Sequence, residues 1–101
     1  MTEAAITSQG QGALHLAGVL DYRSGAALRK QGQALIKGSD AAALVVDCSA
    51  VQKSSSVGLS LLLCLMRDAA KAGKGLKVQG MPLDMRQIAE VSGLTALLIQ
   101  D

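Results

Sequence analysis

Aromatic residues are almost absent from this chain of 101 residues, which contains one Tyr and neither Trp nor Phe. Proteins that bind nucleic acids usually cluster their basic residues and add aromatic platforms for base stacking. Here ten Lys and Arg residues are scattered among eight acidic residues, which gives a formal net charge of +2. We therefore expect no nucleic-acid partner.

Cysteine and histidine are also scarce. The two cysteines, Cys48 and Cys64, lie within apolar runs and have no partner at metal-ligand spacing. We interpret them as buried thiols of a reducing compartment without a disulfide, and we expect neither a metal site nor a cofactor. The single histidine, His15, lies between Leu14 and Leu16, and strand alternation predicts that it points to the opposite face of the sheet.

Long apolar runs are missing as well. The longest unbroken run, Leu61 to Met66, falls far short of the ~20 residues that a transmembrane helix needs. The N-terminal residues Met1 to Glu3 lack the basic and apolar regions of a signal peptide. We therefore expect a cytoplasmic protein that inserts no segment into a membrane. With half of its residues apolar, the chain has the size of a single domain over residues 1–101.

The apolar runs and glycines divide the chain into seven expected elements. Two short apolar segments, 4–8 and 13–17, flank a glycine turn and predict a pair of antiparallel strands. A helix capped by Asp21 is expected from about Tyr22 to Gly38. The later elements are a strand over 41–47, a helix over 56–72, a strand over 76–79 and a helix over 82–91. This order predicts an α/β fold with a parallel crossover, and the apolar run 41–47 predicts a central strand buried on both faces.

Two glycines, Gly25 and Gly32, lie inside the first expected helix, seven residues apart. A glycine within a helix costs up to ~1 kcal/mol relative to Ala. The pair therefore indicates either a close approach of this helix to the sheet or a soft helix, and the sequence leaves both interpretations open.

Three consecutive serines, Ser54, Ser55 and Ser56, occupy the expected loop between the central strand and the longest helix. One serine is enough to cap the helix by accepting a hydrogen bond from a free amide of its first turn. The others, preceded by Lys53, would present hydroxyl groups at the positive end of the helix, which favours a phosphate, a carboxylate or a polar group of a partner. Plain capping and a binding loop are the two interpretations at this point.

The helix after the serines carries two apolar stripes. One stripe has the spacing of a face that packs on the sheet, and it consists of Leu59, Leu62, Leu63, Met66, Ala69 and Ala70. Leu61 and Leu65 lie beside it, so the first turns are apolar almost all round. Because a helix on a sheet in so small a domain should keep one face in water, we predict that a partner covers Leu61 and Leu65. The alternative is that neighbouring helices cover them.

The serines do not complete a catalytic site. Ser56-Val57-Gly58 resembles the second half of a G-x-S-x-G nucleophile elbow, but Ser54 stands in place of the first glycine. The only histidine of the chain falls in an expected early strand, so a general base has no evident source. We therefore predict that the protein is not an enzyme.

The segment 45–51, Val-Val-Asp-Cys-Ser-Ala-Val, with Gly58-Leu59 and the leucine-rich helix that follows, resembles the signature of STAS domains. Members of this family read D-L-S-x-V and then D-S-S-G-L or D-T-S-G-L. The similarity extends to the two-strand opening and to the closing segment 80–94. It implies a small α/β domain with a mixed β-sheet whose helices pack mainly on one face.

The STAS motifs align with this chain without gaps. Asp47 and Ser49 match the acid and the serine of the first motif, and Gly58 matches the glycine of the second. Ser56 matches the serine or threonine that is phosphorylated in some members, and Ser55 stands where the family usually has Asp. The resemblance therefore implies Ser56 as a possible phosphorylation site, without the neighbouring acid.

Within the family, the chain is similar to the MlaB-type subunit of the bacterial Mla phospholipid-transport ABC system, which serves outer-membrane lipid asymmetry. This resemblance implies a non-catalytic accessory subunit that binds the cytoplasmic ATPase, supports its assembly and activity, and is peripheral to the inner membrane through that partner. From the loop, the helix and the resemblance, the predicted partner-binding residues are Lys53, Ser54, Ser55, Ser56, Gly58, Leu61 and Leu65.

A neighbouring branch of the family implies an alternative function. In anti-sigma-factor antagonists a partner kinase phosphorylates the serine that Ser56 matches, and the added charge of about −1.5 to −2 expels the partner. The alternative is therefore a regulator that is switched by phosphorylation at Ser56.

Overall fold

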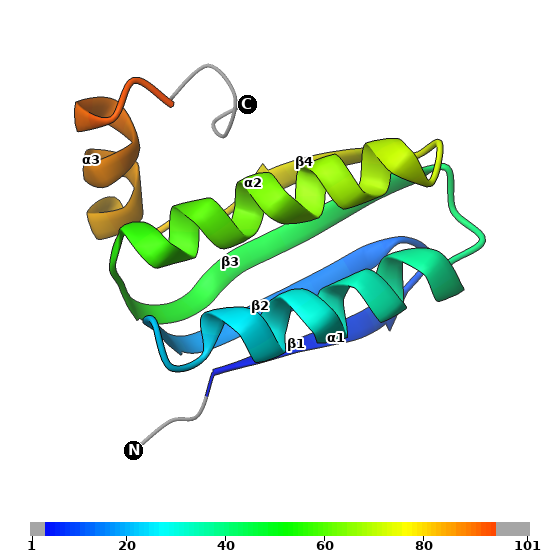
Figure 1. Ribbon diagram of the computed structural model, residues 1–101, viewed down its shortest axis with the longest axis horizontal. Coiled ribbons are helices and arrows are strands. Elements are labelled where there is room, and N and C mark those ends of the chain that lie inside the picture. Colours follow the sequence, from blue (N-terminus) through cyan, green and yellow to red (C-terminus); the bar gives the residue numbers. More distant parts are fainter. Residues whose placement is uncertain (1–3, 95–101) are drawn as a thin grey trace.

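The four strands of the protein form one mixed sheet. The computed structural model describes residues 4–94. The elements are β1 (Ala5–Gly10), β2 (Ala13–Leu20), α1 (Gly25–Gly38), β3 (Ala43–Ser54), α2 (Ser56–Lys71), β4 (Gly75–Gln79) and α3 (Leu83–Val91) (Figure 1). In the sheet order β1-β2-β3-β4, β1 is antiparallel to β2, whereas β2, β3 and β4 are parallel. The predicted α/β class, the antiparallel opening pair and the parallel crossover through the long helix are confirmed.

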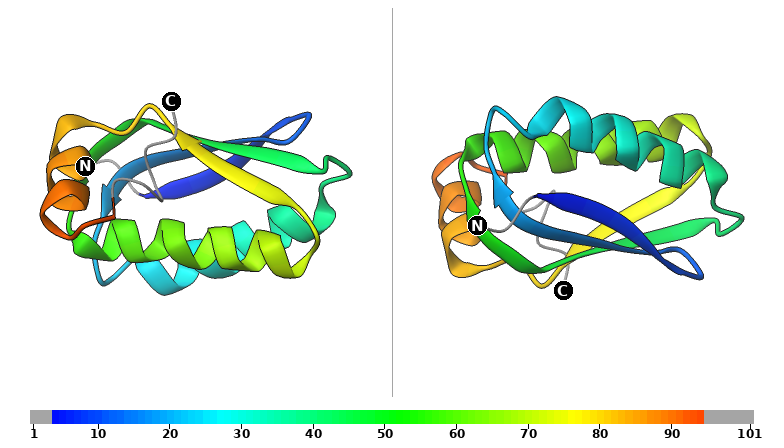
Figure 2. Two further views of the ribbon diagram at one scale, coloured as in Figure 1. Left: turned by 90° about the horizontal axis from the view of Figure 1, so that it is seen from above. Right: turned by 90° about the horizontal axis from the view of Figure 1, so that it is seen from below.

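The two long helices cover one face of this sheet. Figure 2 shows α1 and α2 side by side in one layer, while the opposite face of the sheet carries no helix of the described chain. The short helix α3 lies at one end of the molecule, beside the start of α2 (Figure 1). The helices thus pack mainly on one face, as the STAS resemblance implies.

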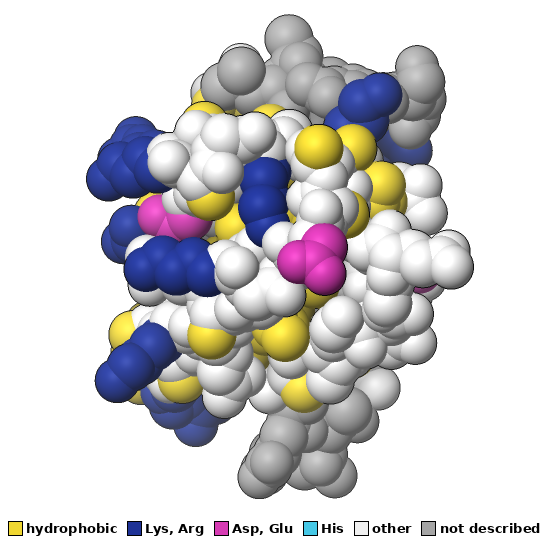
Figure 3. Space-filling view, turned by 90° about the vertical axis from the view of Figure 1, so that its right-hand side faces the viewer, with side chains coloured by type: hydrophobic (Ala, Val, Ile, Leu, Met, Phe, Trp, Pro, Cys, Tyr) yellow, Lys and Arg dark blue, Asp and Glu magenta, His cyan; other side chains and the backbone are white. Residues whose placement is uncertain are grey.

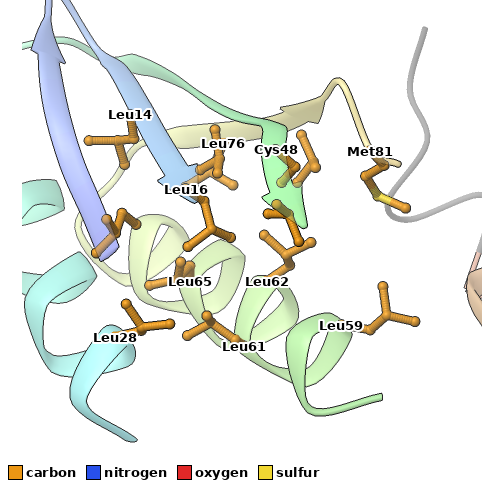
Figure 4. Close-up of a cluster of buried hydrophobic side chains, with 14 of the residues drawn as sticks. Leu14, Leu16, Leu28, Cys48, Leu59, Leu61, Leu62, Leu65, Leu76 and Met81 are labelled. Atoms are coloured by element: carbon orange, nitrogen blue, oxygen red, sulfur yellow. The ribbon is translucent and has the colours of Figure 1, made fainter. Parts of the chain in front are cut away.

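The hydrophobic core lies between the sheet and this helix layer (Figure 4). Every second residue of β2 is buried, including Leu14 and Leu16, and His15 between them is half-buried on the open face, as predicted. The apolar start of β3 behaves in the same way, because Val46 is buried and Val45 only partly so. The prediction of a central strand buried on both faces is wrong, since Val45 and Asp47 are only partly buried and the helices of residues 4–94 cover one face.

Strand β3 is longer than predicted. It continues from the apolar run through residues 48–54, which the sequence assigns to a loop. Val51 of this extension is buried in the core, and the last two residues, Lys53 and Ser54, pair with the end of β2. The pairing supplies backbone hydrogen bonds to a segment whose own composition does not favour a strand.

Helix α1 begins later than predicted. Asp21 does not cap a helix at Tyr22; its carbonyl accepts hydrogen bonds from the amides of Ser24 and Gly25, and its carboxylate accepts one from the amide of Arg23. These bonds close a turn, after which the helix starts at Gly25 with Ser24 as its N-cap. Tyr22 therefore stays outside the helix, with 82% of its surface exposed.

Close packing explains the glycines of α1, although the neighbour is helix α2 as well as the sheet. A Cβ atom on Gly32 would lie 2.5 Å from Cδ2 of Leu65 and 3.5 Å from Cδ1 of Ile6 in β1. A Cβ atom on Gly25 would lie 3.0 Å from Cγ1 of Val57 in α2. The two glycines thus let α1 lie tightly against α2, which favours the close-approach interpretation over a soft helix.

Candidate partner-binding site

The three serines lie at the end of the molecule where β2 and β3 finish and where α1 and α2 begin (Figure 1). Ser54 is the last residue of β3, Ser55 is the N-cap of α2, and Ser56 is the first helical residue. The amide of Ser55 donates a hydrogen bond of 3.1 Å to the carbonyl of Leu20 at the end of β2. This bond fixes the position of the serine loop relative to the sheet.

Each serine has a different environment. The hydroxyl of Ser55 accepts a hydrogen bond of 3.2 Å from the amide of Val57 and so caps α2. The hydroxyl of half-buried Ser54 donates to the carbonyl of Ser55 at 2.8 Å. Capping therefore accounts for Ser55 and a local bond for Ser54. Ser56 serves neither purpose, and its side chain is exposed on the first turn of α2, where incoming negative charge is stabilised.

Gly58 lies beneath the serine loop. It is buried, contrary to its predicted contact with a partner. A Cβ atom at this position would lie 2.1 Å from Oγ of Ser54 and 3.1 Å from Cδ1 of Leu20. The absence of a side chain at Gly58 therefore allows the end of β3 to turn directly into α2. Gly58 thus positions the serine loop by leaving room for Ser54.

The prediction that Leu61 and Leu65 face a partner is wrong. Only 5% of Leu61 and none of Leu65 is exposed, and both lie in the core on the side of α1 (Figure 4). The tight approach at Gly32 brings α1 over them, so a neighbouring helix covers the second stripe. Leu63 and Met66, expected against the sheet, are only half-buried. The buried residues of α2 are Gly58, Leu59, Leu61, Leu62, Leu65 and Ala69.

Exposed apolar side chains flank the serine loop, and the sequence interpretation missed them. Tyr22 lies in the turn before α1, whereas Val91, with 90% of its surface exposed, lies on α3. Ser54 itself lines a surface groove of about 430 Å³ together with Ile88 and Val91. A signal was available in the sequence, because Met85 and Ala89 have the i, i+4 spacing of one helix face. Leu83 and Val91 fall outside that face.

The charged residues near the serine loop are partly paired. Lys53 is exposed at the end of β3. The guanidinium of Arg23 lies 3.0 Å from the carboxylate of Asp21. This hydrogen bond, with another from the backbone amide of Arg23, holds the pKa of Asp21 below its ordinary value. Lys53 and the three serines thus follow one another from the end of β3 into the first turn of α2.

The first STAS motif has a structural role on the open face of the sheet. The carboxylate of Asp47 accepts a hydrogen bond of 3.0 Å from the amide of Ser49 and lies 3.9 Å from Nδ1 of His15. The amide and hydroxyl of Ser49 lower the pKa of Asp47, burial opposes them, and His15 adds a smaller lowering. A Cβ atom on Gly80 would lie 2.6 Å from Oδ1 of Asp47. The segment that follows β4 thus packs closely against this motif at Gly80.

Within residues 4–94, no three His, Cys, Asp or Glu side chains come together as a possible metal site. No helix in the same part of the chain is long and apolar enough to cross a membrane.

Comparison with known proteins agrees with this fold and with the motif. A family model described as "Mlab, STAS domain" matches residues 4–100, so the chain belongs to this family of STAS domains. No curated protein sequence is significantly similar to the chain.

Solved structures of anti-sigma-factor antagonists share the fold. The unphosphorylated form of SpoIIAA has a TM-score of 0.75 at 15% identity, covering 98% of this chain and 88% of its own. An anti-sigma factor antagonist from Mycobacterium paratuberculosis has a TM-score of 0.75 at 24% identity, covering 96% and 82%. The phosphorylated form of the Bacillus cell fate determinant SpoIIAA has a TM-score of 0.66 at 17% identity, covering 98% and 91%. At these identities the likeness concerns the fold alone.

Proposed function

We propose that the protein is a non-catalytic accessory subunit that binds the cytoplasmic ATPase of an Mla-type phospholipid-transport ABC system and supports its assembly and activity. The observation that carries the proposal is membership of the MlaB-type STAS family over nearly the whole chain. In this proposal the protein is cytoplasmic and reaches the inner membrane only through the ATPase.

The proposed docking surface is the end of the molecule that holds the serine loop. Ser55 and Ser56 are exposed at the start of α2, beside the exposed Lys53. An apolar anchor of the ATPase would enter the groove between Ser54 and Val91, and an acceptor group would bind the first turn of α2. Such a surface combines apolar and polar contacts, as protein interfaces commonly do.

Native purification of the tagged protein tests the proposed partner. We expect an ABC ATPase and its membrane permease to co-elute, as identified by mass spectrometry. Co-elution of a sigma-factor regulator and a serine kinase, without the ATPase, would reject the proposal. The tagged variant Val91→Asp changes the groove of the proposed docking surface and leaves the core intact, because Val91 is exposed. It should therefore recover less of the ATPase than the wild type does.

The second candidate is an anti-sigma-factor antagonist switched at Ser56. One observation favours it: Ser56 is exposed on the first turn of α2, where a phosphate would be stabilised by the helix end. Ser55 in place of the usual acid weakens the match to substrates of such kinases. Incubation with the cognate kinase and ATP should then add one phosphate to the protein and none to the Ser56→Ala variant. No mass shift, or a shift that persists in Ser56→Ala, would reject this candidate.

A further inference from the structure

A groove runs between α1 and α2. Its wider part, of about 700 Å³, lies near the starts of both helices, and its lining includes Tyr22, Ala26, Val57 and Cys64. The groove passes Arg29 and Gln33 and continues into a hollow of about 290 Å³ that is lined also by Lys37, Asp68 and Lys71. The wider part is mainly apolar, and the narrower part is charged.

The two helices that form the groove carry half of the Lys and Arg residues but only one acidic residue. Together α1 and α2 hold five Lys or Arg residues and one acid, a net charge of +4, whereas the remaining residues hold five against seven, a net charge of −2. The one acid, Asp68, lies 3.5 Å from the guanidinium of Arg29. Figure 3 shows Lys and Arg side chains gathered along its left edge, which is the side of the helix layer. The two helices of the groove therefore have a net positive charge, whereas the rest of the chain has a net negative charge.

We propose that this groove binds an acidic amphipathic helix of a protein partner. The apolar side of that helix would lie against Val57 and Cys64, and its carboxylates would pair with Lys30, Lys37 and Lys71. The surface is separate from the α3 side of the serine loop, so the inference goes beyond the proposed function and does not depend on the identity of the ATPase.

The shape of the groove favours a helix over an anionic membrane. A protein that lies on a bilayer inserts large apolar side chains from a convex face. Apart from Tyr22 at one end of the groove, the exposed residues beside it, such as Ala26, Lys30 and Ser60, are small or charged, and the groove between them is concave. A bilayer surface cannot enter such a groove, whereas a helix can lie along it.

Cys64 provides a direct reporter of groove occupancy. It lines the groove and is half-buried, which corrects the prediction that both thiols are buried. Cys48 is fully buried in the core, where burial raises its pKa to about 12. A thiol reagent should therefore modify Cys64 in the folded protein and leave Cys48 unmodified, so that modification of Cys48 reports loss of the fold.

The probe is a synthetic peptide of Glu and Leu, about 18 residues long so that it forms a helix, with leucines at helical spacing. A peptide of the same pattern with Lys in place of Glu is the charge control. We expect the Glu/Leu peptide to slow the modification of Cys64 about fivefold or more at low salt, and the Lys/Leu peptide to leave it unchanged.

Charge reversal on the groove should remove this protection. The double variant Lys30→Glu, Lys37→Glu is expected to lose it, and the milder Lys30→Gln, Lys37→Gln to reduce it. Lys77→Glu, the same change on the exposed edge strand β4, should retain it. The proposal would be overturned if both peptides protected Cys64 equally or if neither protected it. It would also be overturned if vesicles of phosphatidylglycerol protected Cys64 and the Glu/Leu peptide did not.

Discussion

Replacement of Gly58 by Ala tests how the serine loop is held. In an ordinary helix interior, Gly→Ala stabilises by about 0.5 to 1 kcal/mol. Here the new Cβ atom would lie 2.1 Å from Oγ of Ser54 and 3.1 Å from Cδ1 of Leu20. Ser54 must then rotate away and give up its bond to the carbonyl of Ser55. Overpacking of this kind costs about 1 to 3 kcal/mol, so we expect Gly58→Ala to lower the free energy of unfolding by about 1 kcal/mol.

A double-mutant cycle isolates this contact. Ser54→Ala removes the hydroxyl that obstructs the new Cβ atom, although Cδ1 of Leu20, at 3.1 Å, and the retained Cβ of residue 54, at 3.3 Å, still have to shift by a few tenths of an ångström. In the Ser54→Ala background, Gly58→Ala should therefore be nearly neutral, which corresponds to a coupling energy of about 1 kcal/mol or more. Urea unfolding followed by circular dichroism measures all four proteins.

Gly38→Ala is the matched control, because Gly38 also lies in a helix and a Cβ atom there would meet nothing within 4 Å. It should be neutral or stabilising. If Gly58→Ala stabilised the protein as much as Gly38→Ala does, with no coupling to Ser54, the account of Gly58 as the residue that positions the loop would be refuted.

Leu65, Ser55 and Asp47 each allow a further test of the structure. Leu65→Ala should lower the free energy of unfolding by about 2 to 5 kcal/mol in urea titrations. The control Leu83→Ala, at an exposed position, should lower it by less than about 0.5 kcal/mol. Equal losses of stability in the two variants would contradict the burial of Leu65. Ser55→Ala should lower the free energy of unfolding by about 1 kcal/mol through loss of the N-cap, whereas Ser56→Ala should lower it by less than about 0.5 kcal/mol. A larger loss for Ser56→Ala than for Ser55→Ala would indicate that Ser56 is the N-cap. Because the folded state lowers the pKa of Asp47, its stabilising contribution is present above the unfolded pKa and is lost as the pH falls through the folded value. Asp47→Asn should therefore reduce the acid dependence of stability below about pH 4, and an unchanged acid limb would argue against the bond to Ser49.

The sequence predicts the elements of this fold well where local signals are strong. The serines before the apolar helix predict the start of α2 at Ser56, and the glycines after it predict its end. Strand alternation predicts the half-buried position of His15. The sequence pattern misplaces the start of α1 because Asp21, although a good cap residue, closes a turn through its carbonyl and carboxylate instead.

The errors at the candidate site have a common physical cause, which is packing between segments distant in the sequence. A helical pattern shows that Leu61 and Leu65 are apolar but not which element lies over them. That element is α1, and its approach depends on Gly32, 33 positions before Leu65 in the chain. Likewise, the groove between Ser54 and Val91 exists only because α3 folds back beside the end of β3. The glycines of α1 indicate a close approach, but the local sequence does not identify the element that approaches Leu65 or Ser54.

The affinity of the isolated protein for the purified Mla-type ATPase tests the central proposal most directly. Ser56→Glu places a charge on the exposed first turn of α2, and Ser8→Glu makes the same change at an exposed position of β1, near the opposite end of the sheet. We predict that Ser56→Glu weakens binding about tenfold or more, as expected for a charge desolvated in an interface, and that Ser8→Glu leaves the Kd within about twofold of the wild type. A Ser56→Glu protein that binds the ATPase as tightly as the wild type would contradict the proposal that the serine loop is the docking site.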